Sequence, residues 1–273
     1  MNKGINGLSK DRLGKLEQRF LSYAQMRRLT TVHYGEARSI LALTDLQEKK
    51  VLSRLARAGV IVRLKRGVYL FPSRLQLGGI WNPGEYLILQ ELMKACDKGR
   101  YQLCGWQMFN RYGFSEQVPT CVYAYNNRLC GNKTIGGQGF TLIKVADERL
   151  GGTENVRTPD GVDMIVPTKA RVLMDAVYDW SRFDTLPIAY GWIRQAVRAD
   201  RQLADELAQA ACRYGNQGTM RRIGYVLESL ELRGAWKTCL QMALRQSTSL
   251  IPLLPSQAAR GMANWEWGVI VNE

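Results

Sequence analysis

Eight polar side chains between residues 49 and 66 have the chemistry needed to bind a nucleic acid. Five recur on one side of a predicted helix, and three belong to a short β-hairpin that follows it. Ammonium and guanidinium groups bind phosphate oxygens, and a guanidinium can also donate two hydrogen bonds to one guanine edge. The predicted DNA-binding residues are Lys49, Lys50, Ser53, Arg54, Arg57, Arg63, Lys65 and Arg66.

The position of each side chain in this pattern predicts its role. The three at the centre of the exposed helix face, Lys50, Ser53 and Arg57, are expected to reach base edges, with Arg57 donating to O6 and N7 of guanine. Contacts to phosphates fix the register of a protein on DNA without reading its sequence. We assign that second role to the outer cations, which are Lys49, Arg54, Arg63, Lys65 and Arg66.

The positive charge of the chain is concentrated around these residues. The 273 residues have a formal net charge of +14. Residues 1–75 contain sixteen Lys and Arg against five Asp and Glu, so that segment alone has a net charge of +11. Binding of phosphates by such a segment releases condensed counterions from a polyanion, whereas a charge needed only for solubility would be spread more evenly.

The chain offers little for catalysis. Its single histidine, His33, is not accompanied by a nucleophile elbow, so we expect a structural or phosphate-contacting role for it rather than general-base catalysis. The glycine-rich segment 136–139 lacks the Gly-Lys-Ser/Thr ending of a phosphate-binding loop and predicts a hairpin turn.

Metal chemistry is also disfavoured. Asp160 and Asp163, which follow the pair Gly151-Gly152, are the residue types of a nucleotidyltransferase metal site, but they stand in a turn sequence whose carboxylates need not converge. The six cysteines contain no Cys-x-x-Cys pair, which argues against structural zinc and a disulfide scaffold and predicts reduced thiols. We therefore predict no catalytic residue, no metal site and no cofactor.

Two helices are predicted ahead of the basic helix. Apolar residues at helical spacing predict a first helix over 11–26, and we expect a second, shorter helix over 35–41. Thr44 and Gln47 have the spacing of a capping box, in which each side chain binds a backbone N–H of the other residue. They predict the start of the third, basic helix.

The basic helix is predicted to end just before a hairpin. We expect it to stop near Ala58, with Gly59 in the left-handed conformation that terminates many helices. Two β-rich runs between Val60 and Phe71 are hinged at Arg66-Gly67 and predict the hairpin.

This order of elements is typical of a winged helix-turn-helix, whose third helix enters the major groove of DNA while the hairpin lies along the backbone or in the minor groove. Two alternatives are an ordinary solvated charge run and a winged helix that docks a protein. The concentration of charge in 1–75 favours DNA.

A second domain is predicted after turn chemistry at 76–83, which gives domains 1–75 and 84–273. Its pattern is that of an α+β domain with a helical C-terminal portion from about residue 188. The predicted elements are a helix at 85–96, strands at 120–125, 140–145 and 162–166, a helix at 170–178, further helices at 201–214, 219–232 and 235–244, and a strand at 265–271 that returns to the sheet.

No apolar run is long enough to cross a bilayer, and the N-terminal residues lack an apolar signal core. We therefore expect a cytoplasmic protein that is not associated with a membrane.

Two sets of motifs run through the chain. The first, shared by many winged-helix repressors, is Glu36-Ala37-Arg38, Val51-Leu52-Ser53-Arg54-Leu55, Ala58-Gly59-Val60 and Arg66-Gly67-Val68-Tyr69. A more specific set follows in the second domain: Gln117-x-Pro119, Pro167-Thr168-Lys169-Ala170-Arg171 with Leu173 and Asp175, and Arg221-Arg222-Ile223-Gly224-Tyr225-Val226-Leu227-Glu228. With these motifs, the sequence resembles the AbiEi-type antitoxins of type IV toxin–antitoxin (abortive infection) systems, over most of the chain.

The resemblance implies an antitoxin whose N-terminal domain represses its own operon at promoter repeats and whose C-terminal domain counters a nucleotidyltransferase toxin, directly or indirectly. A second hypothesis is a winged-helix transcription factor whose second domain senses a ligand or partner, without a toxin. A downstream nucleotidyltransferase gene distinguishes the two. A DNA-processing enzyme is disfavoured because the chain lacks a clustered catalytic set.

Overall fold

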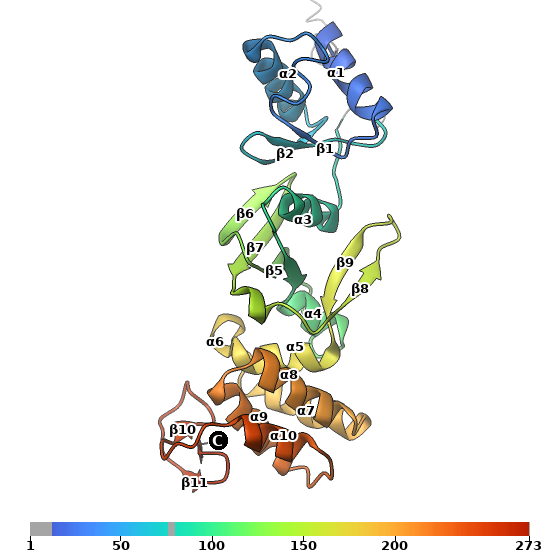
Figure 1. The fold of residues 1–273 in the computed structure, drawn as a ribbon. Helices are drawn as coiled ribbons and strands as arrows, with labels where there is room; N and C mark the ends of the chain where they lie inside the picture. The colour runs from blue at the N-terminus through green and yellow to red at the C-terminus, as the bar shows by residue number, and fades with distance from the viewer. Residues whose placement is uncertain (1–12, 76–79, 273) are drawn as a thin grey trace, which may run out of the picture. The chain divides into compact units, whose positions relative to one another are not determined.

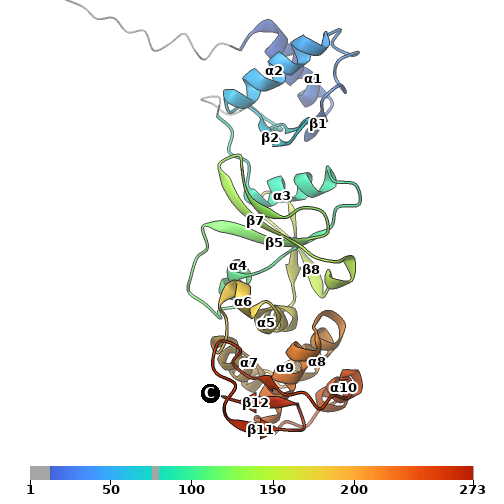
Figure 2. The same cartoon turned by 90° about the vertical axis from the view of Figure 1, so that its left-hand side faces the viewer.

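The computed structural model describes residues 13–75 and 80–272, which form an α+β structure (Figures 1 and 2). The described chain divides into two compact units. The first contains the described part of 1–99 together with 131–141 and 159–163, and the second contains 100–130, 142–158 and 164–272. Helix 85–94 therefore groups with the N-terminal elements, whereas our sequence boundary at 76–83 assigned it to the second domain. The predicted turn at Gly78-Gly79 lies outside the described residues.

In the first unit, two amphipathic helices pack on a small sheet. Helix α1 covers Lys15–Met26, and its start is later than the predicted residue 11, which lies outside the described residues. Helix α2 covers Asp45–Arg57. The apolar sides of the two helices pack together, and the ring of Phe20 in α1 stacks on Phe71 with 5.8 Å between centroids. These contacts form the core of residues 13–75, which we call the N-terminal module.

The predicted second helix at 35–41 is wrong, because residues 34–42 form successive turns. The amide of Leu41 donates to the carbonyl of Ala37, and the amide of Leu43 then donates to the carbonyl of Arg38 while Ala42 is left-handed at φ 49°. This pattern terminates a helix after a single turn. Because nucleation is the costly step of helix formation, a segment this short does not extend further.

The predictions for α2 and the hairpin are confirmed. Both hydrogen bonds of the capping box between Thr44 and Gln47 are present, and Gly59 follows the helix with φ 72°. Strands β2 (Val62–Lys65) and β3 (Val68–Leu70) are antiparallel and are joined by the predicted turn at Arg66-Gly67. Strand β1 (Thr31–His33) pairs with β3 and completes a sheet of order β1-β3-β2.

The middle of the chain supplies strands and two short helices. Helix α3 (Glu85–Lys94) confirms the helix predicted at 85–96. The glycine-rich segment 136–139 contains the predicted turn, which residues 136–137 form between β6 (Gly131–Ile135) and β7 (Gln138–Lys144). The sheet order is β4-β5-β7-β6. The other elements here are β4 (Tyr101–Leu103), α4 (Trp106–Arg111), β5 (Cys121–Asn126), the 3₁₀ turn η1 (Asp147–Arg149), and the hairpin of β8 (Thr153–Arg157) and β9 (Asp163–Pro167).

Residues 169–243 of the second unit are largely helical, and both the helix predicted at 170–178 and those predicted from about residue 188 are present. Buried apolar faces of these helices pack on one another, with α8 in contact with α5, α9 and α10. The helices are α5 (Lys169–Tyr178), α6 (Trp180–Phe183), α7 (Ile188–Ala199), α8 (Leu203–Tyr214), α9 (Gln217–Glu228) and α10 (Trp236–Ala243).

The strand predicted at 265–271 is shorter and does not return to the central sheet. Strand β12 (Val269–Val271) lies between β10 (Ile251–Pro252), which is parallel to it, and β11 (Met262–Asn264), which is antiparallel; Figure 1 labels β10 and β11, and Figure 2 labels β11 and β12. The three short strands form a sheet of their own, and β12 packs on α9. In the described ranges, none of the helices has the length and hydropathy needed to span a membrane.

Candidate nucleic-acid interface

Helix α2 separates its apolar and polar residues as the sequence predicts. Val51, Leu52 and Leu55 are buried against the core, and the predicted contact residues on this helix, Lys49, Lys50, Ser53, Arg54 and Arg57, are all exposed. Leu46 is also exposed, at 59%, one turn before Lys50. The helix therefore presents a stripe of long cations, one hydroxyl and one apolar side chain to solvent.

One predicted cation of α2 and the three of the hairpin line one surface hollow of about 680 Å³, whereas Lys50, Arg54 and Arg57 are not part of its lining. Lys49 reaches it from α2, while Arg63, Lys65 and Arg66 reach it from the hairpin. His33, at the exposed end of β1, lies on the same rim. A concave surface with four cations from two elements concentrates positive potential where a phosphate backbone would pass. The full lining is His33, Tyr34, Lys49, Arg63, Lys65, Arg66, Gly67, Val68, Tyr69 and Ala95.

Two of the predicted contact residues are already engaged within the protein. The guanidinium of Arg54 lies 3.3 Å from the carboxylate of Glu17 in α1. The ammonium group of Lys65 donates to the carbonyl of Ala95, at the C-terminal end of α3, where the helix dipole favours a cation. Within the described residues, Lys49, Lys50, Arg57, Arg63 and Arg66 have no carboxylate or carbonyl partner, so these five are available to a polyanion.

A buried carboxylate that the sequence analysis missed fixes the start of α2. Glu48 is fully buried and accepts hydrogen bonds from the amide of Gly35 at 3.0 Å and from Nε of Arg38 at 3.2 Å. Burial lowers the pKa of Arg38, but its hydrogen bond to Glu48 and the charge of Asp45 outweigh that effect and raise the pKa. The motif Glu36-Ala37-Arg38 thus holds the 34–42 turns against α2. The sequence contains a signal that could have identified this buried carboxylate, because Glu48 falls on the apolar side of the helical wheel of α2.

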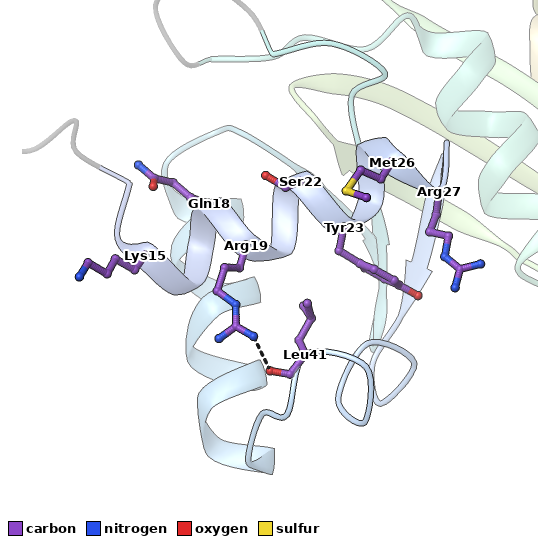
Figure 3. Close-up of a pocket in the computed structure, with 8 residues that line it drawn as sticks. All are labelled: Lys15, Gln18, Arg19, Ser22, Tyr23, Met26, Arg27 and Leu41. Atoms are coloured by element: carbon purple, nitrogen blue, oxygen red, sulfur yellow. Dashed lines mark hydrogen bonds between the residues drawn. The ribbon is translucent and has the colours of Figure 1, made fainter.

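A larger hollow of about 800 Å³ lies along α1 (Figure 3). Its cations, Lys15, Arg19 and Arg27, come from α1 or its C-terminal cap, and Arg19 donates from Nη2 to the carbonyl of Leu41 at 3.2 Å. Arg19 therefore helps to hold the 34–42 turns in place. This hollow receives no side chain from α2 or the hairpin, so the smaller, basic hollow is the better nucleic-acid site despite its size.

The second-domain motif Pro167 to Asp175 supports the fold rather than a surface. Arg171 is fully buried, and its guanidinium donates to Asp175 at 3.0 Å and to the carbonyls of Gly151 and Arg149 at 2.6 and 2.9 Å. Arg149 donates to the other carboxylate oxygen of Asp175 at 2.6 Å. Thr168 caps the same helix, α5. These residues join η1 to α5 through buried, hydrogen-bonded charges.

The motif in α9 also has a packing role. A Cβ placed on Gly224 would lie 2.1 Å from the ring of Trp267, so only glycine admits this indole. Trp267 donates from Nε1 to Glu228 at 2.6 Å, and Lys237 donates to the same carboxylate at 2.6 Å. Burial raises the pKa of Glu228, but the hydrogen bonds from Lys237 and Trp267 outweigh it and leave the pKa lowered.

We expect this lowered pKa to make the second unit sensitive to acid. Ionised Glu228 stabilises the folded state fully above its ordinary pKa of 4.5, and that contribution is lost as the pH falls through the lower folded-state pKa. Urea unfolding at pH 6 and pH 3 should show the wild-type advantage over Glu228→Gln shrinking at pH 3. The exposed Glu206→Gln should follow the wild type at both values, and a constant gap for Glu228→Gln would contradict the assignment.

Asp160 and Asp163 were considered above as residue types of a metal site. Asp160 and Asp163 flank the exposed turn between β8 and β9, and both are exposed. Across 13–75 and 80–272 there is no group of three or more His, Cys, Asp and Glu side chains placed to hold a metal ion.

Comparisons with known proteins bear on the fold. A model described as "Family of unknown function (DUF6088)" matches residues 32–146. A search of curated proteins gave no match. Among solved structures, the RV2827C protein from Mycobacterium tuberculosis is similar, with a TM-score of 0.57 and 13% sequence identity, and the match covers 94% of this chain and 92% of that one. This likeness shows a shared α+β fold.

Proposed function

We propose that the N-terminal module is a winged helix-turn-helix that binds double-stranded DNA and that the protein is a transcriptional autorepressor. The observation that carries the proposal is the convergence of Lys49 from α2 with the cations of the β2–β3 hairpin on one basic hollow. In this proposal α2 is the recognition helix and the hairpin is the wing. The replacement of a second helix by turns leaves α1, α2 and the wing in the required order.

The exposed face of α2 has the chemistry to read bases. Arg57 can donate two hydrogen bonds to guanine, and Lys50 and Ser53 lie on the same face at i, i+3 and i+7 spacing. Exposed Leu46 extends this stripe and suits an apolar contact with a thymine methyl group. Lys49, Arg63 and Arg66 are assigned to phosphates, with smaller contributions from Arg54 and Lys65 because both have partners within the protein.

We further propose that the protein is the antitoxin of a type IV toxin–antitoxin system that counters a nucleotidyltransferase toxin. The support is the sequence resemblance to AbiEi-type antitoxins, including the motifs whose packing roles in α5 and α9 are described above. Co-expression of the neighbouring gene tests this part. Growth arrest that this protein relieves would support it, and arrest that persists in its presence, or no arrest, would leave only the repressor.

Arg57→Ala is the sharpest test of DNA reading. We expect it to weaken binding to the protein's own promoter fragment by about 10-fold or more while changing binding to a random duplex less, since a good bidentate contact contributes about 1–3 kcal/mol of discrimination. Competition binding with the two duplexes at one salt concentration measures the ratio. The matched control is Arg213→Ala, an exposed arginine of α8, which should leave the ratio unchanged. Equal loss on both duplexes would show that Arg57 binds phosphate.

A further inference from the structure

Two cysteine thiols from different helices meet in the second unit. The Sγ atoms of Cys212 in α8 and Cys239 in α10 are 3.4 Å apart, and both side chains are partly exposed. A disulfide has an S–S bond of about 2.05 Å, so side-chain rotation with little backbone movement would bring these sulfurs into bonding distance. The sequence could not predict this proximity, because the two cysteines are 27 positions apart in the chain.

The helix framework on both sides holds the two sulfurs at this separation. Near the start of α10, the amide of Trp236 donates to Asp205 in α8 at 2.6 Å. Beyond the end of α8, Gln217 donates to the carbonyl of Ala243 at 3.2 Å and accepts from the amide of Arg245 at 2.9 Å. The two helices therefore run side by side in the same direction, with the cysteines between two anchored ends.

We propose that Cys212 and Cys239 form an oxidation site, which hydroperoxides or small-molecule disulfides convert into a disulfide linking α8 to α10. The hydrogen-bond pattern assigns the order of events. The thiol of Cys212 donates to the backbone carbonyl of Cys239 at 3.5 Å, and burial together with the neighbouring thiol raises the pKa of Cys212 to about 12. Because this hydrogen bond keeps the proton on Cys212, we assign the first attack on the oxidant to Cys239.

The reaction balances in two steps. The Cys239 thiolate attacks a peroxide oxygen, so that an S–O bond forms, the O–O bond breaks and an alkoxide or hydroxide leaves and takes a proton. Cys212 then loses its proton and attacks the Cys239 sulfur, which forms the S–S bond, breaks the S–O bond and releases water. The two thiols together lose two electrons, and the hydroperoxide gains them. With a small-molecule disulfide, a mixed disulfide replaces the sulfenic acid and two small thiols are released.

Mass spectrometry of the full chain tests this site. Reduced protein treated with hydrogen peroxide at one equivalent should fall from six titratable thiols to four. Trypsin under non-reducing conditions should then release peptide 202–213 linked to peptide 238–245, and dithiothreitol should separate them. Cys130→Ser, which removes an exposed cysteine, should retain the linked pair, whereas Cys212→Ser and Cys239→Ser should each lose it.

A second measurement reports on the helices themselves. Because the cross-link joins α8 to α10, oxidised wild type should melt several degrees higher than reduced wild type, and Cys239→Ser should show no such rise. Circular dichroism of the reduced variants checks that they fold; if a serine variant does not, Cys239→Ala takes its place. The proposal is overturned if six thiols persist after treatment, if either cysteine links to a different one, or if the shift in Tm survives in the Cys239 variants.

Discussion

Replacing both Arg63 and Arg66 with alanine should weaken binding to every DNA duplex by about 100-fold at 0.1 M salt. Each guanidinium is exposed in or beside the hairpin turn and lines the basic hollow without a partner within the described residues. A charge-assisted hydrogen bond contributes about 1.5 kcal/mol or more, close to a tenfold change in affinity for each. Loss of two phosphate contacts should also reduce the slope of log K against log salt by about two units.

Fluorescence anisotropy with a labelled duplex across a salt series measures both effects. The charge-matched control is Arg198→Ala with Arg201→Ala, two exposed arginines of the second unit that carry the same total charge. The control should leave the salt slope unchanged. Equal weakening by the two double variants would mean that net charge, and not the hairpin, governs binding, and the assignment of the hairpin as a wing would then fail.

The sequence predicted those parts of the module that depend on short-range chemistry. The bounds and capping box of α2, the glycine after it, the turn at Arg66-Gly67 and the exposed cations of α2 all follow from residues within a few positions of one another. A helix was predicted at 35–41 where the structure has turns at 34–42, because the sequence does not distinguish a single helical turn from a longer helix. What stopped it is the left-handed Ala42, a position where sequence favours glycine.

The remaining errors concern contacts between residues far apart in the chain. Lys65 is the same kind of residue as Lys49, but its ammonium group donates to the carbonyl of Ala95, thirty positions later in the chain. The pairing of Arg54 with Glu17 spans 37 positions. The motif around Arg171 was recognised as a resemblance, but its role was hidden because the carbonyls of Arg149 and Gly151 that it binds lie 22 and 20 positions earlier in the chain. Local patterns cannot predict such distant partners. The ion pair between Arg171 and Asp175 is different, because residues four positions apart lie on the same face of a helix.

Asp175→Ala should be the most destabilising single substitution considered, with an expected loss of about 3–5 kcal/mol in the free energy of unfolding. The carboxylate is 3% exposed and accepts from both Arg149 and Arg171, so its removal leaves two buried guanidinium groups without their counter-ion. Arg149 has few other hydrogen bonds to compensate for this loss, because its Nε and Nη1 atoms already lack a hydrogen-bond partner in the described structure.

Urea unfolding followed by circular dichroism measures this loss. Since domains are stable by about 5–15 kcal/mol, a change of this size should move the urea midpoint of the second unit well below that of the wild type. Glu206→Ala removes a carboxylate from an exposed position of α8 and should cost less than about 1 kcal/mol. Asp175→Asn keeps the shape and one acceptor oxygen and should fall between the two. If Asp175→Ala unfolds within 1 kcal/mol of the wild type, the buried arginines are not held by this carboxylate, and the packing role assigned to the α5 motif is wrong.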